Sequence, residues 1–206
     1  MTNILNRNLV FAFIILFMVV SCGASGNARV LVVPTADTLR PGQTNLGYYL
    51  HRQSHYLEAN FGIVDGLSMG VTGIVRDVQF RGNARLRILE ESVQMPGIAV
   101  GMEFGSKVSL YGTVSKQLGA AGVRGHLAFG SGRYSKGMAG VSAVINPVQV
   151  KTAGGYQMPS MSIALEYDGT GLNAGLMAQF SPQFSAHLAV SDFRELGLGL
   201  NYRIGF

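Results

Sequence analysis

The chain has 206 residues, of which 28 are glycine and 48% are apolar, but only 13% are charged, with a formal net charge of +5 at pH 7. Soluble domains usually have about 25% charged residues, so this chain has too few charges to cover an ordinary water-facing surface. The basic residues are scattered, and without a Lys and Arg run we expect no nucleic-acid partner.

Residues 1–22 have the layout of a secretory signal peptide. Arg7 precedes twelve uncharged apolar residues at 9–20, and a stretch of small residues follows them. Twelve helical residues would cover only ~18 Å of a hydrocarbon core about 30 Å thick, which disfavours a spanning helix. We therefore expect a signal peptide at 1–22, a lead segment at 23–43 and the folded domain at 44–206.

Cys22 closes the sequence VVSC, which resembles the lipobox of bacterial lipoproteins. It is also the single cysteine of the chain, so no intrachain disulfide can form. Two outcomes of processing stay open. Either Cys22 is a lipid attachment site, or cleavage falls after Ala24 or Ala28 and Cys22 is discarded.

From residue 44 onwards, short segments alternate apolar residues with small or polar ones, which is the period of a β-strand. We predict twelve strands, at 44–52, 55–63, 67–75, 83–90, 97–104, 108–116, 123–130, 137–145, 160–167, 172–180, 184–190 and 197–206. After the signal peptide no apolar run approaches the ~18 residues of a membrane helix. The pattern predicts an all-β fold, a single transmembrane antiparallel barrel of roughly ten to fourteen strands.

The alternation places several charged residues on the face opposite the apolar one, and these would point into the lumen. They are Arg85, Arg87, Glu103, Arg124, His126, Glu166 and Arg203. A dry core would not tolerate so many charges, whereas a wet or mutually paired lumen would. They either attract an anionic polymer or pair with one another and plug a narrow barrel.

The last strand alternates apolar residues up to a terminal aromatic. Its apolar set is Leu198, Leu200, Tyr202, Ile204 and Phe206. This ending resembles the assembly signal of bacterial outer-membrane barrels. It predicts contact with the barrel-assembly machinery and with membrane lipids, in the outer membrane of a didermic bacterium.

Several segments resemble the YjbH-type barrels, outer-membrane proteins associated with exopolysaccharide production. They include VVPTADTLRPGQ, YLEANFGIVDGLSMGV, MPGIAVGMEF, YGTVSKQLG, ALEYDGTGLNAGL and GLGLNYRIGF. This resemblance spans nearly all of the chain after the signal peptide, although the chain is short for that family. It implies a non-enzymatic role in exopolysaccharide assembly or export, with polysaccharide or export-complex proteins as partners.

No catalytic, cofactor-binding or metal-binding residues are predicted. His126 and His187 lack the His-x-Ser pattern of lipid A deacylases, although Ser185 shares a face with His187. His51 and His55 lack a third metal ligand nearby. Two alternatives stay open: a lipid-modifying outer-membrane enzyme, and a lipid-anchored periplasmic barrel that binds an apolar ligand.

Overall fold

The computed structural model describes residues 31–51, 53–76, 78–119, 122–146 and 158–205. The predicted signal peptide, Cys22 and Phe206 lie outside these described residues. Twelve strands are present: β1 (Thr44–His51), β2 (Ser54–Val64), β3 (Leu67–Ile74), β4 (Gln79–Leu89), β5 (Gly97–Phe104), β6 (Ser109–Gln117), β7 (Val123–Gly130), β8 (Met138–Asn146), β9 (Ser160–Tyr167), β10 (Leu172–Gln179), β11 (Phe184–Ser191) and β12 (Glu195–Ile204). A short 3-10 helix, η1 (Gly132–Tyr134), lies between β7 and β8.

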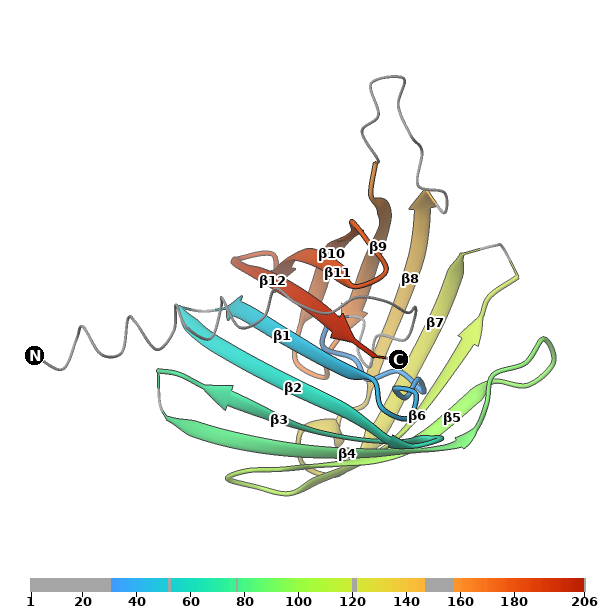
Figure 1. The fold of residues 1–206 in the computed structure, drawn as a ribbon, viewed down its shortest axis with the longest axis horizontal. Helices are drawn as coiled ribbons and strands as arrows, with labels where there is room; N and C mark the ends of the chain where they lie inside the picture. Colours follow the sequence, from blue (N-terminus) through green and yellow to red (C-terminus); the bar gives the residue numbers. More distant parts are fainter. Residues whose placement is uncertain (1–30, 52, 77, 120–121, 147–157, 206) are drawn as a thin grey trace, which may run out of the picture.

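The strands form one closed antiparallel barrel in which each pairs with its sequence neighbours and β1 pairs with β12 (Figure 1). Closure is made by the pairing of Thr44 with Ile204 at one end and of His51 with Gly197 at the other. The predicted fold class is therefore confirmed, and so is the number of strands. We call the end where β1 begins and β12 ends the terminal rim, and the other end the opposite rim.

Two strands, β4 and β12, differ from the prediction by more than one residue at a boundary. β4 begins at Gln79 rather than at 83, because Ile74 pairs with Gln79 across a short connection. Gly82 continues this strand, and a Cβ atom there would collide with the ring of Phe104 on β5. β12 spans Glu195–Ile204 rather than 197–206, because Glu195 already pairs with Ser191.

The outer face of the barrel is apolar. Leu57, Val100, Leu127, Ile163 and Leu198, from five different strands, all point outward and are 45 to 51% exposed. A continuous apolar band on the outside of a barrel is the surface that faces lipid rather than water. Lipid cannot bond the backbone N–H and C=O groups, but in a closed barrel the neighbouring strands bond them. The alternative of a soluble periplasmic barrel is therefore wrong.

Outward-facing aromatic side chains collect at both ends of the apolar band. Phe80, Phe104, Phe129 and Tyr167 lie near the opposite rim, and Phe61, Phe180 and Phe184 lie near the terminal rim. Two such girdles mark the membrane interfaces of outer-membrane barrels. Phenylalanine and tyrosine build them here because the chain has no tryptophan.

Among the described residues, no helix has the length and hydropathy needed to cross a membrane.

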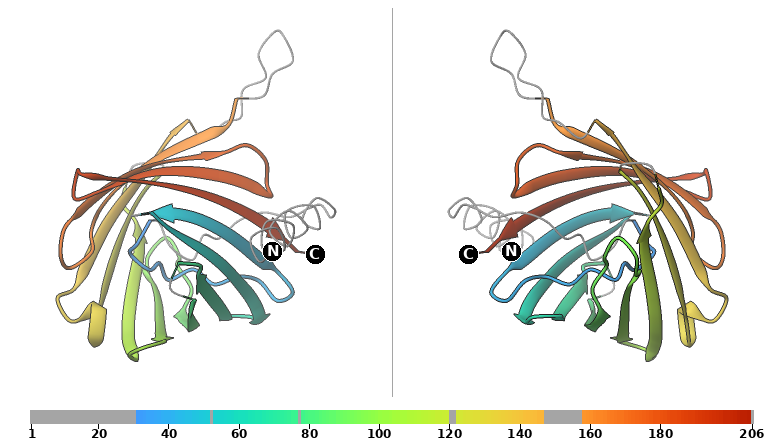
Figure 2. Two further views of the ribbon diagram at one scale, coloured as in Figure 1. Left: turned by 90° about the vertical axis from the view of Figure 1, so that its left-hand side faces the viewer. Right: turned by 90° about the vertical axis from the view of Figure 1, so that its right-hand side faces the viewer.

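Residues 31–43 belong to no strand ladder of the barrel and lie inside it, as the blue trace within the ring of strands shows (Figure 2). Val33, Ala36 and Leu39 of this stretch are at most 2% exposed. We call residues 31–43 the inner segment. A twelve-stranded wall encloses more space than its own side chains fill, and the inner segment occupies part of that space.

We expect Leu127→Arg, which places a charge on the lipid face near the middle of β7, to destabilise the barrel by about 2–4 kcal/mol. Val78→Arg lies in the β3–β4 connection at 79% exposure and should change the stability by less than about 1 kcal/mol. Urea unfolding of the protein refolded into lipid vesicles measures both. Equal, small effects at the two positions would show that Leu127 does not face lipid.

Candidate functional site

Glu166 of β9 holds the start of the inner segment near the opposite rim. Its carboxylate accepts hydrogen bonds from the backbone N–H groups of Leu31, Val32 and Val33, at 2.9, 2.7 and 3.1 Å. Glu166 is only 1% exposed. A buried carboxylate is costly unless its oxygens are bonded, so the inner segment supplies the donors that allow this charge to be buried.

Hydroxyl groups of β6 bind the middle of the inner segment. The hydroxyl of Thr113 donates to the carbonyl of Pro34 at 2.7 Å, and the N–H of Ala36 donates to Oγ of Ser115 at 2.9 Å. Ser115 in turn lies 2.9 Å from Nδ1 of His126 on β7. These residues bind an extended backbone much as a neighbouring strand would, but through side chains.

Asp37 of the inner segment meets Arg124 of β7 in a bidentate ion pair. The two nitrogen–oxygen distances are 2.6 and 2.8 Å. Arg124 also contacts Glu91, from the β4–β5 connection, at 2.7 Å. Arg85 of β4 donates to the backbone carbonyl of Asp37 at 3.1 Å. The strand arginines are thus compensated by acceptors from outside the strands.

The last part of the inner segment lies against β2 and β3 at the terminal rim. The N–H of Leu39 donates to the hydroxyl of Ser68 at 2.8 Å, and the N–H of Gly42 donates to the carbonyl of Gly62 at 3.0 Å. A Cβ atom on Gly62 would overlap the carbonyl of Arg40. Glycine at this position therefore lets the inner segment approach the wall closely before it turns into β1.

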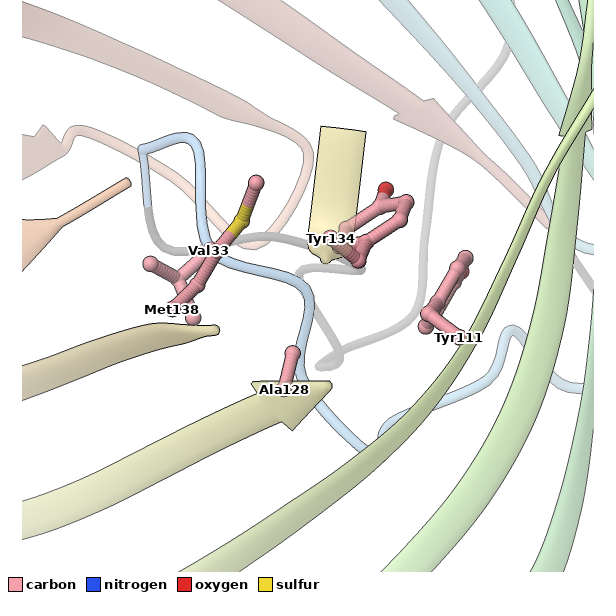
Figure 3. Packing of buried hydrophobic residues seen from close by; sticks show 5 residues of the cluster. All are labelled: Val33, Tyr111, Ala128, Tyr134 and Met138. Carbon is pink, nitrogen blue, oxygen red and sulfur yellow. The ribbon is translucent and has the colours of Figure 1, made fainter. Parts of the chain in front are cut away.

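A small apolar cluster packs around the inner segment near the opposite rim. Figure 3 shows Val33 beside Met138 and Ala128, with the rings of Tyr134 and Tyr111 close by. The two tyrosine rings have centroids 4.5 Å apart. Tyr134 is fully buried and comes from η1. Residues 130–137 have the glycine-rich sequence GSGRYSKG, which superficially resembles a phosphate loop. Through Tyr134 they instead pack against the inner segment.

The remaining charges predicted to face the lumen lie nearer the rims. Glu103 accepts a hydrogen bond from the hydroxyl of Tyr134 at 2.8 Å and contacts Arg133 at 3.3 Å. Arg87 contacts Asp65 of the β2–β3 turn at 2.8 Å. Arg203 is 7% exposed and lies near the terminal rim. The structure thus brings Arg85, Arg124, His126 and Glu166 together around the inner segment, and leaves Arg203 on another wall.

The histidines do not form an exposed catalytic arrangement. Ser115 and His126 are within hydrogen-bonding distance, but they are 0 and 3% exposed, and Ser115 also binds the N–H of Ala36. His187 stacks on Tyr49 with ring centroids 5.1 Å apart. A hydrolytic serine must reach its substrate, whereas Ser115 is covered by the inner segment.

His51 and His55 lie on opposite faces of the wall. His51 contacts Glu195 at 3.8 Å, and His55 bonds the hydroxyl of Tyr48 at 2.6 Å. In the part of the chain that the structure describes, no group of three or more His, Cys, Asp or Glu side chains is placed to hold a metal ion.

Asp168 closes the β9–β10 turn and is not paired with Glu166. Burial raises the pKa of Asp168, but hydrogen bonds from Thr170, Asn173 and Gly171 outweigh it and lower that pKa to about 2. Glu166 and Asp168, the two carboxylates of the sequence EYDG (166–169), therefore have separate structural roles.

A cavity of about 210 Å³ with a mixed polar and apolar lining lies at the terminal rim, on the wall away from most of the inner segment. Its lining comes from β8, β9, β10, the β10–β11 connection, β11, β12 and β1, and includes Asn45, Ser162, Gln179, Asn201 and Arg203. The lumen is thus divided between a wall covered by the inner segment and a wall with open polar space.

The alternation predicts the strand charges but not most of their partners. Asp37, Ser68, Glu91, Thr113 and Ser115 were not predicted as site residues. One signal was available: Val32, Val33, Ala36 and Leu39 make the stretch before the first strand more apolar than a solvated tail would be. Such a stretch needs a place to be buried, and a barrel wider than its wall can fill offers one.

No protein-family model matches the chain, and no curated protein matches its sequence. Two solved structures are similar in fold. A KdgM porin has a TM-score of 0.55 and 13% sequence identity, covering 80% of this chain and 99% of the porin. A KdgM porin in complex with disordered oligogalacturonate has a TM-score of 0.57 and 11% identity, with the same coverage. These comparisons do not support the YjbH resemblance specifically. The chain has the fold of an outer-membrane porin, and with its apolar outer face this confirms the predicted location in the outer membrane of a didermic bacterium.

Proposed function

We propose that this protein is a non-enzymatic outer-membrane barrel that binds or passes a saccharide chain during the assembly or export of exopolysaccharide. The observation that carries the proposal is the divided lumen. The inner segment covers one wall, and a polar cavity with Arg203 at its lining opens on another. Hydroxyl, amide and guanidinium groups are the groups that bind sugar hydroxyls and acidic substituents.

Two further observations support the same proposal. One of the similar porins was solved with oligogalacturonate, an acidic saccharide. The YjbH-type motifs also include VVPTADTLRPGQ, which is the inner segment itself apart from its first residue, Leu31. Both point to a saccharide as the cargo. They favour a channel over an enzyme, since the one serine–histidine pair described above is buried.

Two predicted roles depend on Cys22 and Phe206, which lie outside the described residues, and remain proposals. The alternating apolar residues of β12, with Phe206 after them, would be recognised by the barrel-assembly machinery. Cys22 would carry a lipid if the lipobox is used.

The inner segment should narrow the channel, and its hold depends on Glu166. In Glu166→Gln, one carboxylate oxygen is replaced by an amide NH₂ group, which cannot accept hydrogen bonds from the backbone N–H groups of residues 31–33. Hydrogen bonds to charged groups contribute about 1.5–3 kcal/mol each, so amide exchange in residues 31–33 should rise by roughly tenfold or more. Hydrogen–deuterium exchange measures this effect, and single-channel recording should show a larger or fluctuating conductance.

Glu90→Gln is the matched control, because Glu90 has a side chain that is 78% exposed and lies outside the lumen wall. It should leave both exchange and conductance unchanged. If Glu166→Gln behaves like Glu90→Gln, the inner segment is not held by this carboxylate.

The proposed role in exopolysaccharide is tested by deletion of the gene in its own host. We expect less exopolysaccharide at the cell surface, restored by the wild-type chain supplied in trans. Quantifying an unrelated outer-membrane barrel in the same cells controls for a general envelope defect. Unchanged exopolysaccharide in the deletion strain would contradict the proposed function.

A further inference from the structure

We propose that the cavity at the terminal rim is a binding subsite for one acidic sugar unit of a saccharide chain. Arg203 binds the carboxylate of the sugar, and Asn45 accepts a hydrogen bond from a sugar hydroxyl. This inference rests on the proposed function and names its substrate class. We call the cavity the terminal-rim subsite. Its polar side chains come from Asn45, Ser160, Ser162, Gln179, Ser181, Gln183, Ser185, Asn201 and Arg203.

Asn45 gives the first argument. It is only 9% exposed, it lines the cavity, and its side-chain oxygen Oδ1 is buried without a hydrogen-bond partner. A buried acceptor without a donor costs about 1–3 kcal/mol. Because Asn45 lines the cavity, a ligand hydroxyl that enters it would supply that donor after a small rotation of the amide.

Arg203 gives the second argument. It pairs in register with Asn45 on the adjacent strand, so the two side chains lie next to each other on the inner face. Its guanidinium group carries several N–H donors in a planar fork that suits a carboxylate, and it can hold a ligand oxygen alongside its bonds within the protein. No acidic side chain is among the described residues that line the cavity. Its only charged side chain is therefore a cation.

The size and the remaining lining suit a sugar ring. A cavity of about 210 Å³ is smaller than the pockets of drug-sized ligands, at roughly 300–1,000 Å³, and suits one ring rather than a long chain. Apolar surface in the same lining comes from Met177 together with Val144, Met161, Pro182 and Phe184. A ring with polar edges and apolar faces matches such a mixed lining.

The position of the subsite fits export. It lies at the rim where β1 begins and β12 ends, which is the periplasmic end if both chain termini stay in the periplasm. A polymer leaving the cell would enter the lumen at the rim that holds the subsite.

The test uses the full-length protein in detergent and oligogalacturonate of a few units as the probe, with its methyl ester as the uncharged counterpart. Calorimetry should show binding of the acid and at least about tenfold weaker binding of the ester. Arg203→Gln and Arg203→Lys should weaken binding of the acid by a similar factor, because lysine keeps the charge but loses the fork. Asn45→Asp, which keeps the shape and adds a negative charge, should also weaken it.

Arg87→Gln is the matched control, because Arg87 also lies on the inner face at the terminal rim but pairs with Asp65 away from the cavity. It should bind the acid as the wild type does. A heat-dependent shift in gel mobility verifies that each variant is folded. If Arg203→Gln does not fold, Asn45→Asp and Arg203→Lys carry the test.

Equal binding of acid and ester, or equal losses in Arg87→Gln and Arg203→Gln, would overturn the subsite. So would the absence of any binding to the wild type. If the subsite is overturned but the deletion strain still loses exopolysaccharide, the proposed function stands without the subsite. Failure of the subsite can therefore be distinguished from failure of the proposed function.

Discussion

A charge inside a membrane-embedded barrel is tolerated only when a partner neutralises it or bonds to it, and here many of the partners come from outside the strands. Asp37 lies against Arg124, and three successive backbone N–H groups lie against the carboxylate of Glu166. The inner segment and the polar wall therefore depend on each other. Without the segment, several buried charges would lose their partners, and without those charges the segment would lose the bonds that hold residues 31–33 and Asp37.

This dependence determines how the lumen is used. The inner segment lies along β2, β3, β4, β6, β7 and the opposite-rim end of β9. The terminal-rim subsite lies against other parts of the wall, including the terminal-rim end of β9. A wall that a fixed partner already satisfies is unavailable to a passing ligand. The uncovered wall, with the unmatched acceptor of Asn45, is where a saccharide can form bonds.

The strand pattern was predictable because lipid outside and polar groups inside impose a strict period of two on every strand. Residues such as Arg85 and Glu166 could be assigned to the inner face from that alternation alone. Their partners could not be assigned, because Asp37 reaches Arg124 across 87 positions of the chain, and no local pattern encodes such a contact. The sequence left open whether the lumen charges attract a polymer or plug the barrel. Arg124 and Glu166 are paired with the inner segment, as the plugging alternative expects. Attraction of an anionic polymer remains a proposal for Arg203.

The placement of the inner segment is tested most directly by a disulfide between Ala36→Cys and Ser115→Cys, whose backbone nitrogen and hydroxyl oxygen lie 2.9 Å apart in the native chain. The pair would be oxidised in isolated outer membranes and the linked peptides identified by mass spectrometry. We expect a link between positions 36 and 115, and none when Ala36→Cys is combined with Ser185→Cys on the uncovered wall. An absent link at 36–115, or equal linking in both pairs, would contradict a lumen held by its own N-terminal segment.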